Sequence, residues 1–223
     1  GPGRLIIPDV DETYAPSAFL CAEAFEQMEL AEGALAAAPT QRSFFIVEPG
    51  DLKLETAFLD EIERATADDD LPLCPVPLEW REGRWRAWQA PADHPLGARY
   101  RNLERLFLHQ VYDEQKELLD RLHRARGEDL FVATQALHEL EGQEDHLSVA
   151  VWSRGIHSLL PRADRIAFVD RAVDPPTQLQ VDWEDAVRIA GHLMEEVPGM
   201  RPRRYAVGAF PDAGSLVALE KTV

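Results

Sequence analysis

The sequence predicts an α+β fold with a mixed, largely antiparallel sheet, several hairpins and about four helices packed on it. Two observations carry this prediction. Segments with helical and strand periodicity alternate irregularly along the 223 residues, and turn residues separate several strand segments closely enough for hairpins. We expect one domain over residues 1–223, with a possible subdivision near the proline-rich residues 71–77.

The first 70 residues predict two strands and two helices. Pro16 suits the first turn of the first helix and Pro39 would follow its end, with an apolar repeat near 3.6 residues between them. Pro49 and Gly50 make a turn before the second helix. The expected elements are strands at 5–7 and 44–47 and helices at 16–38 and 54–67.

Residues 73–90 predict a hairpin with Glu82 and Gly83 as its two-residue turn. This turn sets the register, so that Trp80 lies opposite Trp85 and Arg81 lies opposite Arg84. Because side chains alternate between the faces of a strand, Trp88 is expected on the other face.

The longest predicted helix covers residues 98–126 and ends at Gly127. Two ion pairs with favourable spacing, Glu117–Arg121 and Asp120–Arg124, are expected along it. Its inward face is predicted to be an apolar stripe formed by Leu103, Phe107, Val111, Leu118 and Leu122.

The last hundred residues predict strands with one helix between them. Residues 130–139 suit either a helix or a strand, and a strand is favoured. Asp182 is expected as the N-cap of a helix that ends near Pro198. The expected strands are 130–139, 146–153, 164–170 and a closing hairpin of 205–210 with 215–220.

The charge of the chain is unevenly distributed. Residues 1–70 hold 16 acidic and 4 basic residues, a net charge of −12, whereas residues 71–126 carry +2 and residues 127–223 carry −7. Such an acid excess repels nucleic acid and anionic membrane surfaces and attracts a basic protein. The two cysteines, Cys21 and Cys74, have no metal-site spacing and are expected to be reduced thiols, as in a cytoplasmic protein.

One short motif predicts chemistry. Asp9-Val10-Asp11-Glu12-Thr13 follows a short apolar run and resembles the D-x-D-x-T opening motif of the haloacid-dehalogenase-like phosphatases. The resemblance implies Asp9 as nucleophile, Asp11 as general acid/base, Thr134 in the second motif, and Mg²⁺ held by Asp9, Asp11, Asp170 and Asp174. The chain has no lysine between Thr134 and Asp170, where the family has one, and the alternative is a solvated acidic turn.

Two further polar groups have weaker patterns. His138 and His146 lie eight residues apart with several carboxylates between them, which is not a zinc-binding helix spacing and suits a polar loop. Ser153 and Ser158 flank His157, but the G-x-S-x-G elbow of a serine hydrolase is absent.

The leading hypothesis is a cytoplasmic, non-catalytic binding protein without a cofactor: an inhibitor or immunity-type protein, an adaptor or an assembly subunit. Its partner would be a protein, basic in character, and a homo-oligomer is possible; nucleic acid and membrane are not expected partners. The candidate contact residues are the aromatic and arginine side chains of the hairpin, Trp80, Arg81, Arg84, Trp85, Arg86 and Trp88. The alternative for Trp80 and Trp85 is a cross-strand pair that covers the core. The enzyme alternative is the Mg²⁺-dependent phosphatase.

Overall fold

A computed structural model describes residues 3–7, 16–17, 19–20, 22–68, 72–140 and 145–222. The chain divides into two compact units, residues 1–107 and 108–223, and each is described here by itself. The division falls inside a long helix, and residues 72–77 belong to a strand of the first unit. The prediction that residues 1–223 form a single domain implies that the chain unfolds cooperatively. It stays a prediction, and a single thermal unfolding transition would support it.

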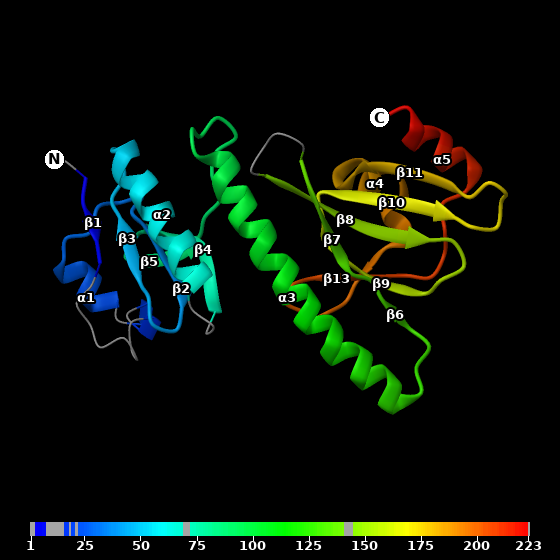
Figure 1. The fold of residues 1–223 in the computed structure, drawn as a ribbon, viewed down its shortest axis with the longest axis horizontal. Helices are drawn as coiled ribbons and strands as arrows, with labels where there is room; N and C mark the ends of the chain where they lie inside the picture. Colours follow the sequence, from blue (N-terminus) through cyan, green and yellow to red (C-terminus); the bar gives the residue numbers. More distant parts are fainter. Residues whose placement is uncertain are drawn as a thin grey trace. The chain divides into compact units, whose positions relative to one another are not determined.

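The first unit is built on one antiparallel sheet of five strands in the order β1-β3-β2-β4-β5. Helix α2 packs on β2 and β3 and runs along one face of this sheet (Figure 1). The elements are β1 (Leu5–Ile6), α1 (Ala22–Gln27), β2 (Leu35–Thr40), β3 (Phe45–Val47), α2 (Leu52–Asp68), β4 (Pro72–Arg81), β5 (Arg84–Ala87) and the start of α3 (Gly97–Arg126).

Strand β2 is buried on both faces. Ala36 and Ala38 pack in an apolar cluster with Phe25 of α1, whereas Leu35 and Ala37 pack in a second cluster with α2 and the start of α3. The helix predicted over residues 16–38 is therefore wrong at its C-terminal end, and α1 is much shorter. A strand covered on both sides lacks the apolar–polar alternation of a half-buried strand, so its alanines suggested a helix.

The second unit contains two four-stranded sheets, ordered β11-β10-β8-β7 and β12-β13-β9-β6. The pairings of β8 with β10 and of β6 with β9 are parallel, and the other pairings in the described part of this unit are antiparallel. The elements are the rest of α3, β6 (Phe131–Val132), β7 (Gln135–Glu139), β8 (His146–Ser153), β9 (Ser158–Pro161), β10 (Arg165–Asp170), β11 (Thr177–Asp182), α4 (Trp183–Ala190), a 3-10 turn (Gly191–Leu193), β12 (Glu195–Glu196), β13 (Arg204–Val207) and α5 (Ala213–Glu220).

Helices α4 and α5 (α5 is red in Figure 1) pack against each other and contribute buried residues to the core of the second unit. Trp183 from α4 and Leu219 from α5 are buried with Trp152 and Phe168 of the sheet. The strand predicted at 215–220 is wrong, because Asp212 caps a helix there and its Oδ1 accepts the Ser215 N–H at 2.7 Å. The described residues contain five α-helices and three antiparallel-rich sheets, which confirms the predicted α+β class. None of the described helices is long and apolar enough to cross a lipid bilayer.

Within the second unit, α3 is held against the β12-β13-β9-β6 sheet by polar contacts. Arg204 of β13 is fully buried, and burial lowers its pKa to about 10, so it is charged at neutral pH. Its guanidinium donates to Gln115 Oε1 at 2.5 Å, to the carbonyls of Ala133 at 2.8 Å and Leu159 at 3.1 Å, and to the carbonyl of Tyr112 at 3.0 Å. One side chain thus joins α3 to the chain following β6 and to β9. We call this set of contacts the polar anchor.

Candidate binding surfaces

The β4–β5 hairpin has the predicted register, with Trp80 opposite Trp85 and Arg81 opposite Arg84. Trp80 is only 4% exposed, and its ring lies 5.1 Å from that of Trp85 and 5.7 Å from that of Phe25. The two tryptophans therefore pack in the cluster on the α1 side of the sheet.

Trp88 belongs to the opposite face, as alternation requires, and its ring lies 4.7 Å from that of Tyr100 and 6.1 Å from that of His94. The rings are in direct contact, so they leave no space for a ligand between them. Tyr100 donates to Glu55 Oε1 at 2.9 Å, and burial beside that carboxylate raises the pKa of Tyr100. The contacts of Trp88, His94 and Tyr100 therefore connect the loop before α3 to helix α2.

The arginines of the hairpin remain exposed, and two of them have carboxylate partners on the hairpin itself. Arg81 Nε lies 2.8 Å from Glu79 Oε2, and Arg86 pairs with Glu82. Arg84 makes no ion pair with any residue that the structure describes. The hairpin is thus largely neutralised by its own acidic residues. Whether this face binds a partner stays a prediction.

Glutamates gather beside the turn of the hairpin. The Glu82 N–H donates to both carboxylate oxygens of Glu32, at 3.1 and 3.3 Å. Glu26 Oε1 would lie 3.3 Å from a Cβ placed on Gly83, so this side chain also reaches the turn. We call the exposed glutamates of this segment the acidic rim: Glu23, Glu26, Glu29 and Glu32.

Most of the acidic rim lacks compensating charge. In the described ranges, no ion pair involves Glu23, Glu26 or Glu29. Arg4 pairs with Glu48 and also interacts electrostatically with Glu29, and the hydrogen bond from Arg4 lowers the pKa of Glu48. Glu23 and Glu26 therefore present carboxylates without an ion-pair partner among the described residues to solvent.

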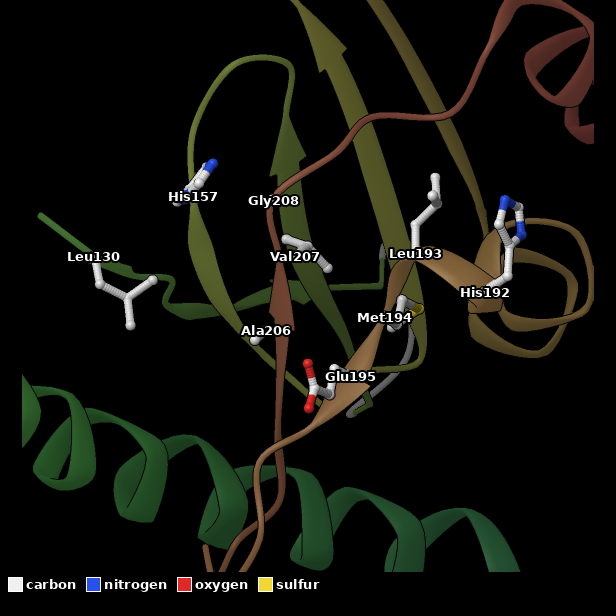
Figure 2. Close-up of a pocket in the computed structure, with 9 residues that line it drawn as sticks. All are labelled: Leu130, His157, His192, Leu193, Met194, Glu195, Ala206, Val207 and Gly208. Atoms are coloured by element: carbon white, nitrogen blue, oxygen red, sulfur yellow. The ribbon is translucent and has the colours of Figure 1, made fainter.

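The second unit contains an open cavity of about 290 Å³ beside β12 and β13 (Figure 2). Glu195 and Ala206 are cross-strand partners and share one face, so the Glu195 carboxylate lies at the cavity. His157 packs on Gly208, where a Cβ would lie 3.4 Å from its Nε2. The lining consists of Leu130, His157, His192, Leu193, Met194, Glu195, Ala206, Val207 and Gly208.

The lining combines the imidazoles of His157 and His192 and the Glu195 carboxylate with aliphatic side chains. This mixture is suited to an aliphatic group with a polar or cationic tip. The lining residues come from four separate segments and carry no sequence motif, so sequence reasoning did not find the cavity.

The structure describes only some residues of the phosphatase hypothesis, which stays a prediction. Asp9 and Asp11 lie outside the described residues. Thr134 lies between β6 of one sheet and β7 of the other, and Asp170 ends β10, which belongs to the same sheet as β7. The Ala172 N–H at 2.9 Å and Arg154 Nε at 2.6 Å both donate to Asp170, and these bonds lower its pKa. Asp174 is exposed between β10 and β11.

Metal ligands are also dispersed. The described ranges contain no group of three histidine, cysteine, aspartate or glutamate side chains that could hold a metal ion. His138 and His146 lie on the neighbouring strands β7 and β8, where His146 pairs with Glu139, and residues 141–144 lie outside the described part.

Comparison with family models, with curated proteins and with solved structures finds no match to this chain.

Proposed function

We propose that the protein is a non-catalytic binding module for a basic protein partner, acting as an inhibitor or immunity-type protein, an adaptor or an assembly subunit in the cytoplasm. One observation carries the proposal. The arginines of the hairpin are mostly paired on the hairpin itself, whereas Glu23, Glu26 and Glu29 beside it have no ion pair among the described side chains.

The charge of the first unit supports a basic partner. Residues 1–107 hold 20 acidic and 10 basic residues, a net charge of −10. A surface of one sign raises the rate of encounter with a partner of the other sign and repels nucleic acid and anionic lipid. The attraction would be screened by salt over a Debye length of roughly 8–10 Å.

The exposed arginines would supply specificity at the edge of this surface. Arg84 has all its guanidinium donors available in the described structure, and it lies two residues from the glutamate that contacts the rim. A partner with a carboxylate among its basic residues would satisfy Arg84 while its cations meet the rim. This arrangement would fix the orientation of the partner in addition to attracting it.

The test is affinity capture from an extract of the source organism with three baits. The first is the wild type, the second carries E23K, E26K and E29K, and the third carries D129K, E139K and E220K. The second and third baits have the same change in net charge, and the control positions are exposed residues of the second unit. We expect a basic protein that binds the first and third baits and is lost from the second.

Purification of the captured protein then allows its affinity to be measured against salt. The proposal expects the affinity to fall at least about tenfold between about 50 and about 200 mM salt. Equal capture by all three baits, or a partner of acidic character, would contradict recruitment by the acidic rim.

The phosphatase alternative has its own test. It expects Mg²⁺-dependent hydrolysis of a generic phosphomonoester that is lost in Asp9→Asn. Turnover that survives this substitution would trace to a contaminant or to other residues, and turnover that depends on Asp9 would replace the binding proposal.

A further inference from the structure

The apolar stripe predicted for α3 is left uncovered in the second unit. Leu118 is 60% exposed and Leu122 is 41% exposed, although both were expected to face inward. The helix instead buries Tyr112 and His123 against the sheet. Its polar contacts there include the polar anchor and two histidine bonds, from His109 Nδ1 to the Gln135 carbonyl at 2.7 Å and from His123 Nδ1 to the Leu130 carbonyl at 3.3 Å.

The exposed apolar residues Leu118, Leu122 and Ala125 are separated by four and three residues, which places them on one side of the helix. Val111, which is half-buried, lies on the same side seven residues before Leu118. Tyr112 and His123 lie on a different side, because they are one residue away from Val111 and Leu122. The stripe therefore faces away from the sheet that anchors the helix.

The charges around this stripe have an order along the helix. Glu114 and Glu117 come before Leu118, and Arg121 and Arg124 come after it. All four side chains are exposed. The acidic end of the stripe thus lies toward the N-terminus of the helix and the basic end toward its C-terminus.

The ion pairs expected within the helix do not form. Asp120 pairs with Lys116 at 2.7 Å and not with Arg124, and no described residue forms an ion pair with Glu117, Arg121 or Arg124. Three charges beside two exposed leucines are therefore free to pair with another molecule.

We propose that this face of α3 binds the same face of a second copy of the chain, with the two helices antiparallel. A two-fold axis near Leu118 would place Leu118 and Leu122 of both copies in one seam. Antiparallel packing brings Glu114 and Glu117 of one copy alongside Arg121 and Arg124 of the other, and the same contacts repeat by symmetry. The four charges lie on one flank of the stripe, so a parallel two-fold pair would place them on opposite sides of the seam without cross-pairing, and the charge order therefore favours the antiparallel dimer.

The dimer is expected to be weak and sensitive to salt. One face of a helix segment of 19 residues is shorter than about 30 Å, which gives a contact at the lower end of the range for specific interfaces. The inference is independent of the proposed function, because the acidic rim belongs to the first unit and the seam to the second. The triple variant E23K, E26K and E29K should lose the basic partner and keep the dimer.

Sedimentation velocity over the micromolar range tests the charge pairing with two double variants. The first variant carries E114R and E117R, so its stripe is positive throughout; the second carries R121E and R124E, so its stripe is negative throughout. We expect each variant alone to dissociate at least about tenfold more readily than the wild type. A mixture of the two should recover association, and this recovery also shows that both variants are folded.

A matched control carries R42E and R171E, which changes the net charge by the same amount as R121E and R124E at exposed sites outside α3. Its dimerisation should match the wild type. The variant L118Q with L122Q removes the apolar seam from an exposed surface and should be monomeric with an unchanged unfolding temperature.

Three results would overturn the proposal. One is a wild type that stays monomeric over the whole concentration range. The second is a dimer that survives L118Q with L122Q. The third is a mixture of the two charge variants that remains monomeric.

Discussion

The aromatic cluster of the β4–β5 hairpin stabilises the first unit, and the polar anchor of α3 stabilises the second unit by a different kind of contact. The hairpin places Trp80 and Trp85 against Phe25 and Phe44, and the packing consists of rings in edge-to-face or tilted contact. The anchor buries one guanidinium whose three nitrogens each donate to oxygens of α3, β9 or the chain between β6 and β7. Apolar packing is non-directional, whereas the anchor depends on the geometry of each hydrogen bond.

The difference has a consequence for the surface. In the second unit, α3 is attached by polar contacts, and its Leu118 and Leu122 remain exposed. In the first unit the hairpin tryptophans pack in the two apolar clusters, and the exposed side chains beside the hairpin turn, Arg81, Glu82, Arg84 and Arg86, are charged. The first unit therefore offers charge to a partner, and the second offers an apolar seam.

The largest expected effect is the loss of the central ring of the aromatic cluster. Trp80→Ala should lower the free energy of unfolding by about 3–5 kcal/mol, because a fully packed indole is replaced by a cavity. Denaturant unfolding measures this loss. Trp80→Phe, which keeps an aromatic ring, should cost clearly less, and equal losses in both variants would show that the indole packing is unimportant.

Arg204→Met should cost about 2–4 kcal/mol, because buried oxygens lose their donors while the apolar replacement fills the space. The loss is smaller than at Trp80, because the Leu159 carbonyl still accepts the Ala133 N–H at 3.1 Å. Arg204→Lys keeps the charge but cannot reproduce the planar fork, so it should recover little. A methionine variant as stable as the wild type would show that the anchor gives no net stability, as can occur for buried charges.

Tyr112→Phe removes a hydroxyl beside the polar anchor, to which Tyr112 contributes only its carbonyl, and should cost about 1–2 kcal/mol. The hydroxyl donates to the Arg203 carbonyl at 2.7 Å and accepts the Arg162 N–H at 3.0 Å, so the variant leaves two backbone groups without this partner. Burial raises the pKa of Tyr112, which keeps the hydroxyl protonated and able to donate. Unfolding curves of Tyr112→Phe and Arg204→Met with their double variant measure the coupling between the two, and purely additive losses would show that the hydroxyl acts independently of the anchor.

The sequence allowed the hairpin to be predicted because its signals are local. Glu82 and Gly83 set the turn, and alternation then placed Trp80, Trp85 and Trp88 on the correct faces. The core position of Trp80 was one of two alternatives left open. The anchor could not be predicted, because Tyr112, Ala133, Leu159 and Arg204 are far apart in sequence and meet only through the sheet order.

Two wrong elements have the same origin. Residues 35–38, which belong to β2, were predicted as helix and residues 215–220 as strand, because short apolar runs of four to six residues carry little periodicity. Strand β2 is stabilised by burial on both of its faces, and the helix at residues 213–220 is stabilised by the Asp212 cap. The same limit applied to α3, where the apolar period correctly located the helix but did not reveal which face the sheet would cover.

The smallest expected effect concerns a polar contact at the surface, in contrast to the buried anchor. Hydrogen bonds from Ser215 at the start of α5 lower the pKa of Asp212. A carboxyl whose pKa is lower in the folded state stabilises the fold above its unfolded value, which is about 4, and this contribution is lost as the pH falls through the folded value. Asp212→Asn keeps an N-cap without titrating, so its stability should vary less with pH between about 2 and 5 than that of the wild type. If the free energies of unfolding of the two proteins vary in parallel with pH, the charge of Asp212 contributes nothing to stability. If the wild type loses its advantage over Asp212→Asn as the pH falls, the charged cap contributes as expected.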